Sequence, residues 1–228
     1  PDNAKTVSFY VKPISKKKKG ANNKETSYWT AVWSDKVIYS FDLNPPKVPP
    51  VPSVTIEKFK LTAELKNLDV NAKTIQFQIV KNDKSVFKTG TATISTTSAS
   101  YSCTVDAGSE YKVRCRSCKD KSYSDWSDYS DNVRTIPSAP SEITSIKAAS
   151  ETSVYLEWAK VASAKTYDIQ YATEKRFFDK SDNVTTKNGI ESTKFEVTGL
   201  ETGDEYFFRV RAVNEAGESS WTKIKSVR

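Results

Sequence analysis

Apolar and polar side chains alternate in short segments along most of the chain. The apolar positions of six such segments are, in chain order, Leu61, Ala63 and Leu65; Ile75, Phe77 and Ile79; Tyr111, Val113 and Cys115; Val154, Leu156 and Trp158; Tyr167, Ile169 and Tyr171; and Tyr206, Phe208 and Val210. A period of two residues is that of a β-strand with one buried face. The best helical candidate, residues 172–180, is short and charged. The pattern therefore predicts an all-β fold of two-layer sandwiches.

Two proline-rich segments divide these strands into blocks. Residues 45–52 read Pro-Pro-Lys-Val-Pro-Pro-Val-Pro, and residues 137–140 read Pro-Ser-Ala-Pro. Proline fixes φ and cannot donate to a β-ladder, so both segments should be stiff, extended linkers. About 85 residues lie between them and about 88 follow, which indicates an internal repeat. We therefore expect domains at residues 1–48, 49–137 and 138–228, arranged as an extended rod.

The repeat is clearest around one strand. Residues 109–116 read Ser-Glu-Tyr-Lys-Val-Arg-Cys-Arg, and residues 204–211 read Asp-Glu-Tyr-Phe-Phe-Arg-Val-Arg. Leu200 lies six residues before Tyr206, and Trp158 lies in the second strand of this block. In these features residues 138–228 resemble the fibronectin type III family. The resemblance implies an Ig-like β-sandwich with strands A to G.

Residues 49–137 match the same pattern with departures. Val105 replaces the family's leucine, and no tryptophan stands in the second strand around residues 61–65. Tyr111 aligns with Tyr206, and the resemblance implies that both are tyrosine corners, whose hydroxyl groups bond back to the preceding turn. We expect a fibronectin type III-like sandwich here too.

The first block, residues 1–48, has the length of a partial domain. Residues 6–11 and 35–41 are expected to be its last two strands, with a lysine-rich hairpin between them. Residues 8–15 and 27–34 are similar to repeats in minor structural proteins of phages that infect Gram-positive hosts. The chain contains no Met and begins with polar residues, so we expect a fragment or a processed chain.

The formal net charge of +7 is concentrated towards the N-terminus. Lys16, Lys17, Lys18 and Lys19 form a run that could attract nucleic acid, anionic lipid or an acidic glycan. The following Gly-Ala-Asn-Asn is typical of a turn, so we interpret the run as a solvated loop tip. The candidate surface-contact residues of this block are these four lysines together with Trp29 and Trp33.

The composition argues against catalysis. The chain has no histidine, which excludes Ser-His-Asp and Cys-His arrangements and imidazole metal sites. Cys115 and Cys118 have a C-x-x-C spacing, but Cys103 alone cannot supply the second pair that a zinc site requires. We expect buried structural cysteines, with a Cys103–Cys115 bridge as an alternative. We assign no catalytic, cofactor-binding or metal-binding residue.

Two further motifs are weak. Asp125, Asp128 and Asp131 lie three residues apart, but the segment lacks the Gly and the bidentate Glu of a dedicated calcium loop. Asn183 begins an Asn-Val-Thr acceptor sequence for N-glycosylation, which matters only in a eukaryotic secretory setting.

Aromatic residues next to arginine-bearing strands form the most informative pattern. Trp126 follows a strand whose outward residues are Arg114 and Arg116, and Trp221 follows a strand with Arg209 and Arg211. Indole faces stacked on guanidinium groups would brace each sandwich, or would offer a platform to a ligand. Residues 123–127, Tyr-Ser-Asp-Trp-Ser, are similar to the Trp-Ser-x-Trp-Ser box of cytokine receptors.

A common fold does not define a function. We expect a non-catalytic structural and adhesive segment of a phage tail or tail-fibre protein, located on the virion surface or in another extracellular setting. Its partners would be other virion tail subunits and a host cell-surface glycan, with no specific nucleic acid and no membrane insertion. A homo-oligomer could form through the full-length protein. The alternatives are a spacer in a secreted bacterial carbohydrate-active enzyme and a cytokine-receptor-like ectodomain.

Overall fold

The structure is a computed structural model that describes residues 46–69, 71–120, 122–180 and 183–228, and the backbone of four short strands nearer the N-terminus. Those strands are β1 (Thr6–Ser8), β2 (Lys18–Lys19), β3 (Glu25–Thr26) and β4 (Ile38–Ser40). The rest of the described chain is also built from strands, with a single four-residue helix, α1 (Phe177–Lys180). The all-β prediction is confirmed.

The first sandwich is formed by strands β5 to β12. Their bounds are β5 (Ser53–Glu57), β6 (Lys60–Leu65), β7 (Thr74–Lys81), β8 (Ser85–Thr93), β9 (Ala99–Thr104), β10 (Glu110–Lys119), β11 (Ser122–Tyr123) and β12 (Val133–Arg134). One sheet has the order β5-β6-β9. The other has the order β11-β10-β7-β8, and β12 pairs with β10.

The second sandwich repeats this topology. Its strands are β13 (Ile143–Ser150), β14 (Ser153–Trp158), β15 (Thr166–Ala172), β16 (Thr185–Ile190), β17 (Lys194–Thr198), β18 (Tyr206–Asn214), β19 (Gly217–Glu218) and β20 (Lys225–Val227). The sheets have the orders β13-β14-β17 and β16-β15-β18-β19, and β20 pairs with β18. Each strand of one sandwich thus has a counterpart in the other.

Each sandwich has its own hydrophobic core. The inward residues of β6, β7 and β10 form one cluster, in which Leu61, Phe77 and Val113 are completely buried. The inward residues of β14, β15 and β18 form the other, in which Leu156 and Phe208 are completely buried. The alternation seen in the sequence therefore places one side chain in two between the sheets. Of the positions expected to face inward, Tyr171 is only half-buried.

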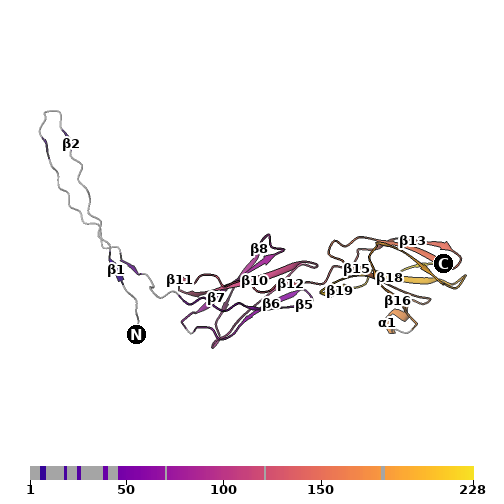
Figure 1. Cartoon of the computed structure of the whole chain (residues 1–228), viewed down its shortest axis with the longest axis horizontal. Coiled ribbons are helices and arrows are strands. Elements are labelled where there is room, and N and C mark those ends of the chain that lie inside the picture. The colour runs from indigo at the N-terminus through magenta and orange to yellow at the C-terminus, as the bar shows by residue number, and fades with distance from the viewer. Residues whose placement is uncertain are drawn as a thin grey trace.

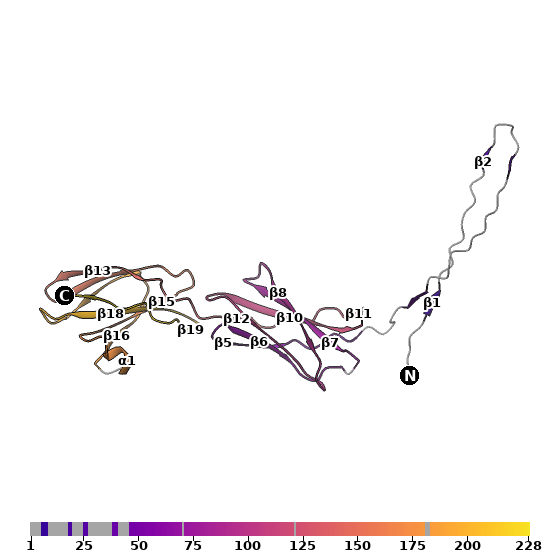
Figure 2. The same cartoon turned by 180° about the vertical axis from the view of Figure 1, so that it is seen from behind.

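The two sandwiches lie end to end, and the C-terminus lies at the end of the second sandwich that is remote from the first (Figures 1 and 2). The connecting segment follows β12 without a further element and enters β13. In it, Pro137 and Pro140 are buried, while Ser138 between them is exposed. The described part of the chain contains no helix with the length and apolar character needed to span a membrane.

Nearer the N-terminus, β1 pairs with β4 and β2 pairs with β3, both antiparallel. The segments expected to be neighbouring strands of the first block are thus paired. Lys18 and Lys19 form β2, so their interpretation as part of a loop tip is wrong, because their backbone pairs with Thr26 and Glu25. Lys16, Lys17, Trp29 and Trp33 lie outside the described residues.

The two sheets of the first sandwich meet at a glycine. A Cβ added to Gly90 in β8 would lie 2.1 Å from atoms of the Tyr101 ring in β9. The Tyr101 ring in turn stacks on Phe77, with ring centroids 5.9 Å apart. Gly90 therefore leaves the space into which this aromatic pair packs.

Gly90→Ala is expected to destabilise the first sandwich by about 1–3 kcal/mol, because the new methyl group overlaps the Tyr101 ring. Urea unfolding, followed by NMR signals of β8, measures the loss. In a Tyr101→Ala background the same substitution should cost almost nothing, since the ring is gone. An equal cost in both backgrounds would contradict this packing.

Candidate functional site

Both tyrosine corners are formed. The hydroxyl of Tyr111 accepts a hydrogen bond from the backbone N–H of Asp106 at 2.8 Å, and that of Tyr206 accepts one from Glu201 at 3.0 Å. The sequence reasoning missed a third such bond, from the N–H of Val161 to the hydroxyl of Tyr167 at 2.8 Å. Each of these bonds ties a loop at a sandwich end to a core strand.

A ladder of alternating cations and aromatic rings covers the outer face of β10. Arg114 and Arg116 lie on the two sides of Trp126, with Cζ 4.7 and 4.6 Å from the ring centroid. Arg116 also stacks on Tyr123 at 4.1 Å, and Arg114 on Tyr129 at 4.9 Å. Lys112 extends the series, with its Nζ 4.6 Å from the Tyr129 ring. Three outward residues of one strand thus alternate with three rings.

A serine repeat holds the rings in place. Residues 123–131 read Tyr-Ser-Asp-Trp-Ser-Asp-Tyr-Ser-Asp, so each third residue faces the same way. The buried hydroxyls of Ser124, Ser127 and Ser130 accept the backbone N–H groups of Ser117, Cys115 and Val113 at 2.9, 3.0 and 3.0 Å, respectively. Each hydroxyl also donates to the carbonyl of the next residue. The serines thus recur every three residues, while the N–H groups that they accept recur every two residues along β10.

Glutamines of the neighbouring strand hold the guanidinium groups. Nε of Arg114 donates to Gln78 at 2.8 Å, and Nε of Arg116 donates to Gln76 at 2.7 Å. Since both amides belong to β7, the ladder joins β7, β10 and the serine repeat across the sheet. A cation stacked on an exposed ring contributes ~0.5–1 kcal/mol to stability, and several such contacts in series stabilise this outer face of the sheet.

The second sandwich carries a shorter version on β18. Trp221 lies between Arg209 and Arg211, at 4.7 and 4.6 Å, and Phe178 of α1 covers Arg209 at 4.5 Å. Burial lowers the pKa of Arg209. Arg211 forms an ion pair of 2.9 Å with Asp168, whose side chain is only 7% exposed.

The hydroxyl acceptors of this second ladder are Ser219 and Thr222, which bond the N–H groups of Ala212 and Val210 at 2.9 and 3.0 Å. The same hydrogen-bonding arrangement is thus repeated with threonine in place of one serine. Phe178, Tyr129 and Lys112 were not identified from the sequence, although the three-residue period of the repeat could have revealed Tyr129.

The remaining candidates form no reactive cluster. Cys103, Cys115 and Cys118 are free and buried, so the alternative of a Cys103–Cys115 bridge is wrong. Burial raises the pKa of the Cys115 thiol to about 11, which keeps it protonated and unreactive at neutral pH. Within the described ranges, no three His, Cys, Asp or Glu side chains are grouped as metal ligands. Asn183 is exposed, with a φ of 56°.

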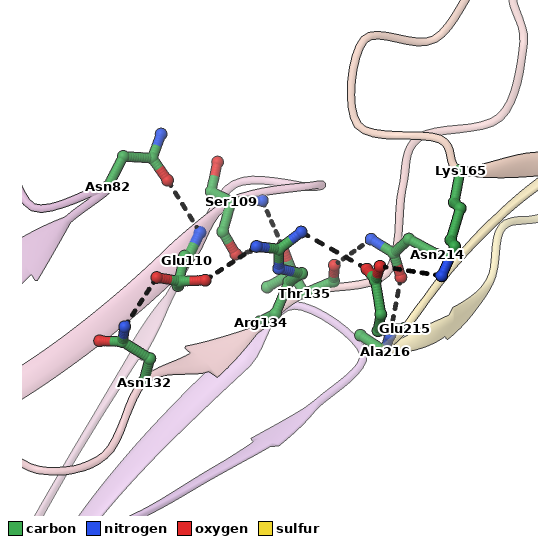
Figure 3. A network of polar contacts seen from close by, with 10 residues as sticks. All are labelled: Asn82, Ser109, Glu110, Asn132, Arg134, Thr135, Lys165, Asn214, Glu215 and Ala216. Atoms are coloured by element: carbon green, nitrogen blue, oxygen red, sulfur yellow. Dashed lines mark hydrogen bonds and ion pairs between the residues drawn. The ribbon is translucent and has the colours of Figure 1, made fainter.

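A polar network joins the two sandwiches, and Thr135 lies at its centre (Figure 3). The N–H of Thr135 donates to the Ser109 carbonyl at 3.0 Å, and its Oγ1 accepts the Ser109 N–H at 2.9 Å. The hydroxyl donates to the Asp106 carbonyl at 2.8 Å. From the second sandwich, Nδ2 of Asn214 donates to the Thr135 carbonyl at 3.0 Å. Thr135 is fully buried and Asn214 is 7% exposed, so these bonds are shielded from water.

Two close approaches accompany this network. Gly108, with a φ of 61°, is so near the second sandwich that an added Cβ would lie 1.9 Å from Oγ of Ser163. Gly217 approaches Ile136: a Cβ added to Gly217 would lie 3.3 Å from Cγ2 of Ile136. Clefts of about 400 and 270 Å³ lie beside the contact, and Gly108 and Ser163 line both. The linker is thus held between loops of both sandwiches.

Charges at the junction are more exposed. Arg134 pairs with Glu110 at 2.8 Å and with Glu215 at 3.5 Å, and Lys165 lies 3.7 Å from Glu215. The pKa of Glu215 is lowered by its own backbone N–H and then by Lys165 and Arg134. Exposed ion pairs contribute only ~0–1 kcal/mol each, whereas an unpaired buried amide or carbonyl costs ~1–3 kcal/mol. The Asn214–Thr135 bond therefore dominates the polar contacts between the sandwiches.

Ser127→Ala should destabilise the first sandwich by about 1–3 kcal/mol, because the buried N–H of Cys115 loses its acceptor. Ser127→Thr should cost much less, since Thr222 makes the equivalent bond in the second sandwich. Chemical denaturation of the two variants measures the difference. A similar loss in both would show that the hydroxyl is not what holds the repeat.

Comparison with known proteins places the second sandwich in a domain family. The family model described as "Fibronectin type III domain" matches residues 138–228. The human protein Brother of CDO is 36% identical over 81 aligned residues, and the match covers 33% of this chain and 7% of the length of that relative. A two fibronectin type-III domain segment from chicken tenascin has a TM-score of 0.44 and 19% identity, covering 79% of this chain and 98% of that one. The chain thus contains a fibronectin type III domain at residues 138–228, preceded by a sandwich with the same strand order.

Proposed function

We propose that the chain is a non-catalytic structural and adhesive segment of a phage tail or tail-fibre protein, which spaces and presents a region that binds the host surface. The observation that carries the proposal is the junction at Thr135, where buried hydrogen bonds join two sandwiches end to end. An element with fixed joints holds what it carries at a fixed distance and direction. A flexible linker would let the same distance vary.

Adhesion is assigned to the N-terminal block. This block carries the four consecutive lysines and most of the net positive charge of the chain. Clustered cations attract polyanions, and the walls of Gram-positive hosts are rich in acidic polymers. The resemblance of residues 8–15 and 27–34 to repeats of phage structural proteins supports the same setting, on the virion surface outside the cell.

The absence of histidine and the inert cysteines support a role without catalysis. The cation–aromatic ladders are assigned to bracing, because the rings of Trp126 and Trp221 have arginines on both sides. Such rings have little free face to offer a ligand. The expected partners are neighbouring tail subunits and a host glycan.

One observation favours a second candidate, a receptor-like ectodomain. The serine hydroxyls of residues 124–130 bond to β10 while the aromatic residues stack on its arginines, and this segment resembles the Trp-Ser-x-Trp-Ser box of cytokine receptors. A spacer in a secreted bacterial enzyme would use the same rigid joint. The three candidates share the mechanical role and differ in what the rod presents.

Asn214→Asp is expected to loosen the joint, because a carboxylate cannot donate to the Thr135 carbonyl yet still accepts the N–H of Ala216. ¹⁵N relaxation should then give the two sandwiches shorter and unequal rotational correlation times. Glu215→Gln is the matched control, since it removes only an exposed charge and should leave the joint rigid. Unchanged relaxation in Asn214→Asp would contradict the assignment of the joint to this bond.

Changing Lys16, Lys17, Lys18 and Lys19 to Glu should weaken binding to an anionic wall polymer such as poly(glycerol phosphate) by at least about tenfold at low salt. Surface plasmon resonance measures the affinity. The control reverses four exposed lysines of the first sandwich, Lys58, Lys60, Lys84 and Lys88. Equal losses in both variants would show that net charge, not the N-terminal run, governs binding.

A further inference from the structure

The two sandwiches differ in how they balance the charge of the arginines on their outer faces. In the second sandwich, β15 places Asp168 opposite Arg211, and Nε and Nη2 of Arg211 both lie 2.9 Å from Oδ2 of Asp168. Nη1 of the same guanidinium group pairs with Glu218 of β19. Two carboxylates of its own sandwich therefore neutralise Arg211.

The first sandwich has uncharged residues at both corresponding positions. The counterpart of Arg211 is Arg116, whose partner in β7 is Gln76 instead of a carboxylate. Tyr123 of β11 takes the place of Glu218. The ladder of the first sandwich thus has the same cations as that of the second, but it lacks their counter-charges.

The guanidinium groups of Arg114 and Arg116 consequently keep unused donors. Each is half-buried, has an aromatic ring on both of its faces, and donates from Nε to a glutamine. Among the described residues, no carboxylate pairs with either group and no acceptor bonds to its Nη atoms. Each group can therefore offer a ligand only its Nη edge. Such a fork of N–H groups fits the two free oxygens of a phosphodiester.

A row of amides and a row of hydroxyl groups lie beside these arginines. The register between β7 and β8 places Gln78 opposite Thr89 and Gln76 opposite Thr91. Both threonines are exposed. Within the described ranges, neither glutamine NH₂ group donates to a protein acceptor. The rows thus offer donors and acceptors without charge, which suit the hydroxyl groups of a polyol.

The second sandwich closes the equivalent surface. Nε2 of Gln170 donates to Oγ1 of Thr186 at 3.1 Å, so this amide is already used. Phe178 of α1 covers Arg209 at 4.5 Å. The open, positively charged surface is therefore a property of the first sandwich and not a consequence of the shared strand order.

We propose that this surface binds a polyol phosphate chain of the host wall. Residues two apart in a strand are ~6.6–6.8 Å apart, so the forks of Arg114 and Arg116 recur at about that interval and receive successive phosphates. The amides and hydroxyl groups beside them bond to the intervening polyol. The surface, called here the anion face, consists of Gln76, Gln78, Thr89, Thr91, Arg114 and Arg116.

Single-stranded nucleic acid also carries phosphodiesters, but the anion face fits it less well. Proteins hold single strands by stacking bases on free aromatic faces. Trp126, the ring between the two arginines, has a guanidinium group on each of its faces. The inference deepens the proposed adhesive function, on which it rests, because it adds a second contact to that of the N-terminal lysines.

Titration of the full chain with poly(glycerol phosphate), followed by the NMR signals of the arginine Nε–H groups, locates the contact. The signals of Arg114 and Arg116 should shift, and those of Arg209 and Arg211 should stay in place. Unmoved Arg114 and Arg116 signals at saturating polymer would overturn the inference and leave the proposed adhesion intact. A chain that does not bind the polymer at all would contradict the proposed adhesion as well.

Gln76→Glu supplies the carboxylate that Asp168 provides in the second sandwich. It keeps an acceptor for Nε of Arg116, so the domain should fold, and it should weaken binding at low salt by about fivefold or more. Gln170→Glu is the matched control, because it adds the same charge beside Arg209 and should change the affinity by less than about twofold. Surface plasmon resonance measures both affinities. Equal losses in the two variants would overturn the inference, since overall charge would then govern binding.

An oligothymidylate, which carries phosphodiesters without a polyol chain, provides the second arm of the experiment. It should bind the unmodified chain more weakly than poly(glycerol phosphate) of equal charge does, because the anion face offers it no free ring. Equal or tighter binding of the oligothymidylate, with shifts of the Arg114 and Arg116 signals, would overturn the assignment of the anion face to a polyol phosphate.

Discussion

Thr135 uses all of its hydrogen-bonding groups within the junction. Its N–H and hydroxyl bond to Ser109 and Asp106 of the first sandwich, and its carbonyl accepts the Asn214 amide of the second. Because the residue is fully buried, none of these bonds can be exchanged for water without opening the joint. The fixed direction of one sandwich relative to the other depends on this constraint more than on the exposed ion pairs around it.

The ladder in the second sandwich contributes to the same constraint from a distance. Asn214 ends β18, and the hydroxyl of Ser219 bonds the N–H of Ala212 two residues before it. Trp221, stacked between Arg209 and Arg211, holds the segment that carries Ser219 against the strand. The stacked residues on the outer face therefore also help to position the Asn214 amide that bonds to Thr135. Packing within the second sandwich thus contributes to the rigidity of the joint.

Much of this could be predicted from the sequence, because it arises from local patterns. Alternation identified the strands, and the register of Tyr111 with Tyr206 placed both corners. Asp125, Asp128 and Asp131 were noticed only for their own spacing, whereas the three-residue period belongs to the serines beside them, whose partners lie on β10. The role of Thr135 could not be read from the sequence, since it depends on Asn214, a residue distant in the chain that the fold brings alongside. The pairing of Lys18 and Lys19 with Thr26 and Glu25 was missed because a run of four lysines shows no alternation of apolar and polar residues.

Buried hydrogen bonds at Thr135 fix the two sandwiches in a single orientation. Residual dipolar couplings measured on the unmodified chain test it most directly. The couplings of β5 to β12 and of β13 to β20 should fit one common alignment tensor in the orientation seen here. Two tensors of different magnitude would mean that the sandwiches move independently, and they would contradict the claim.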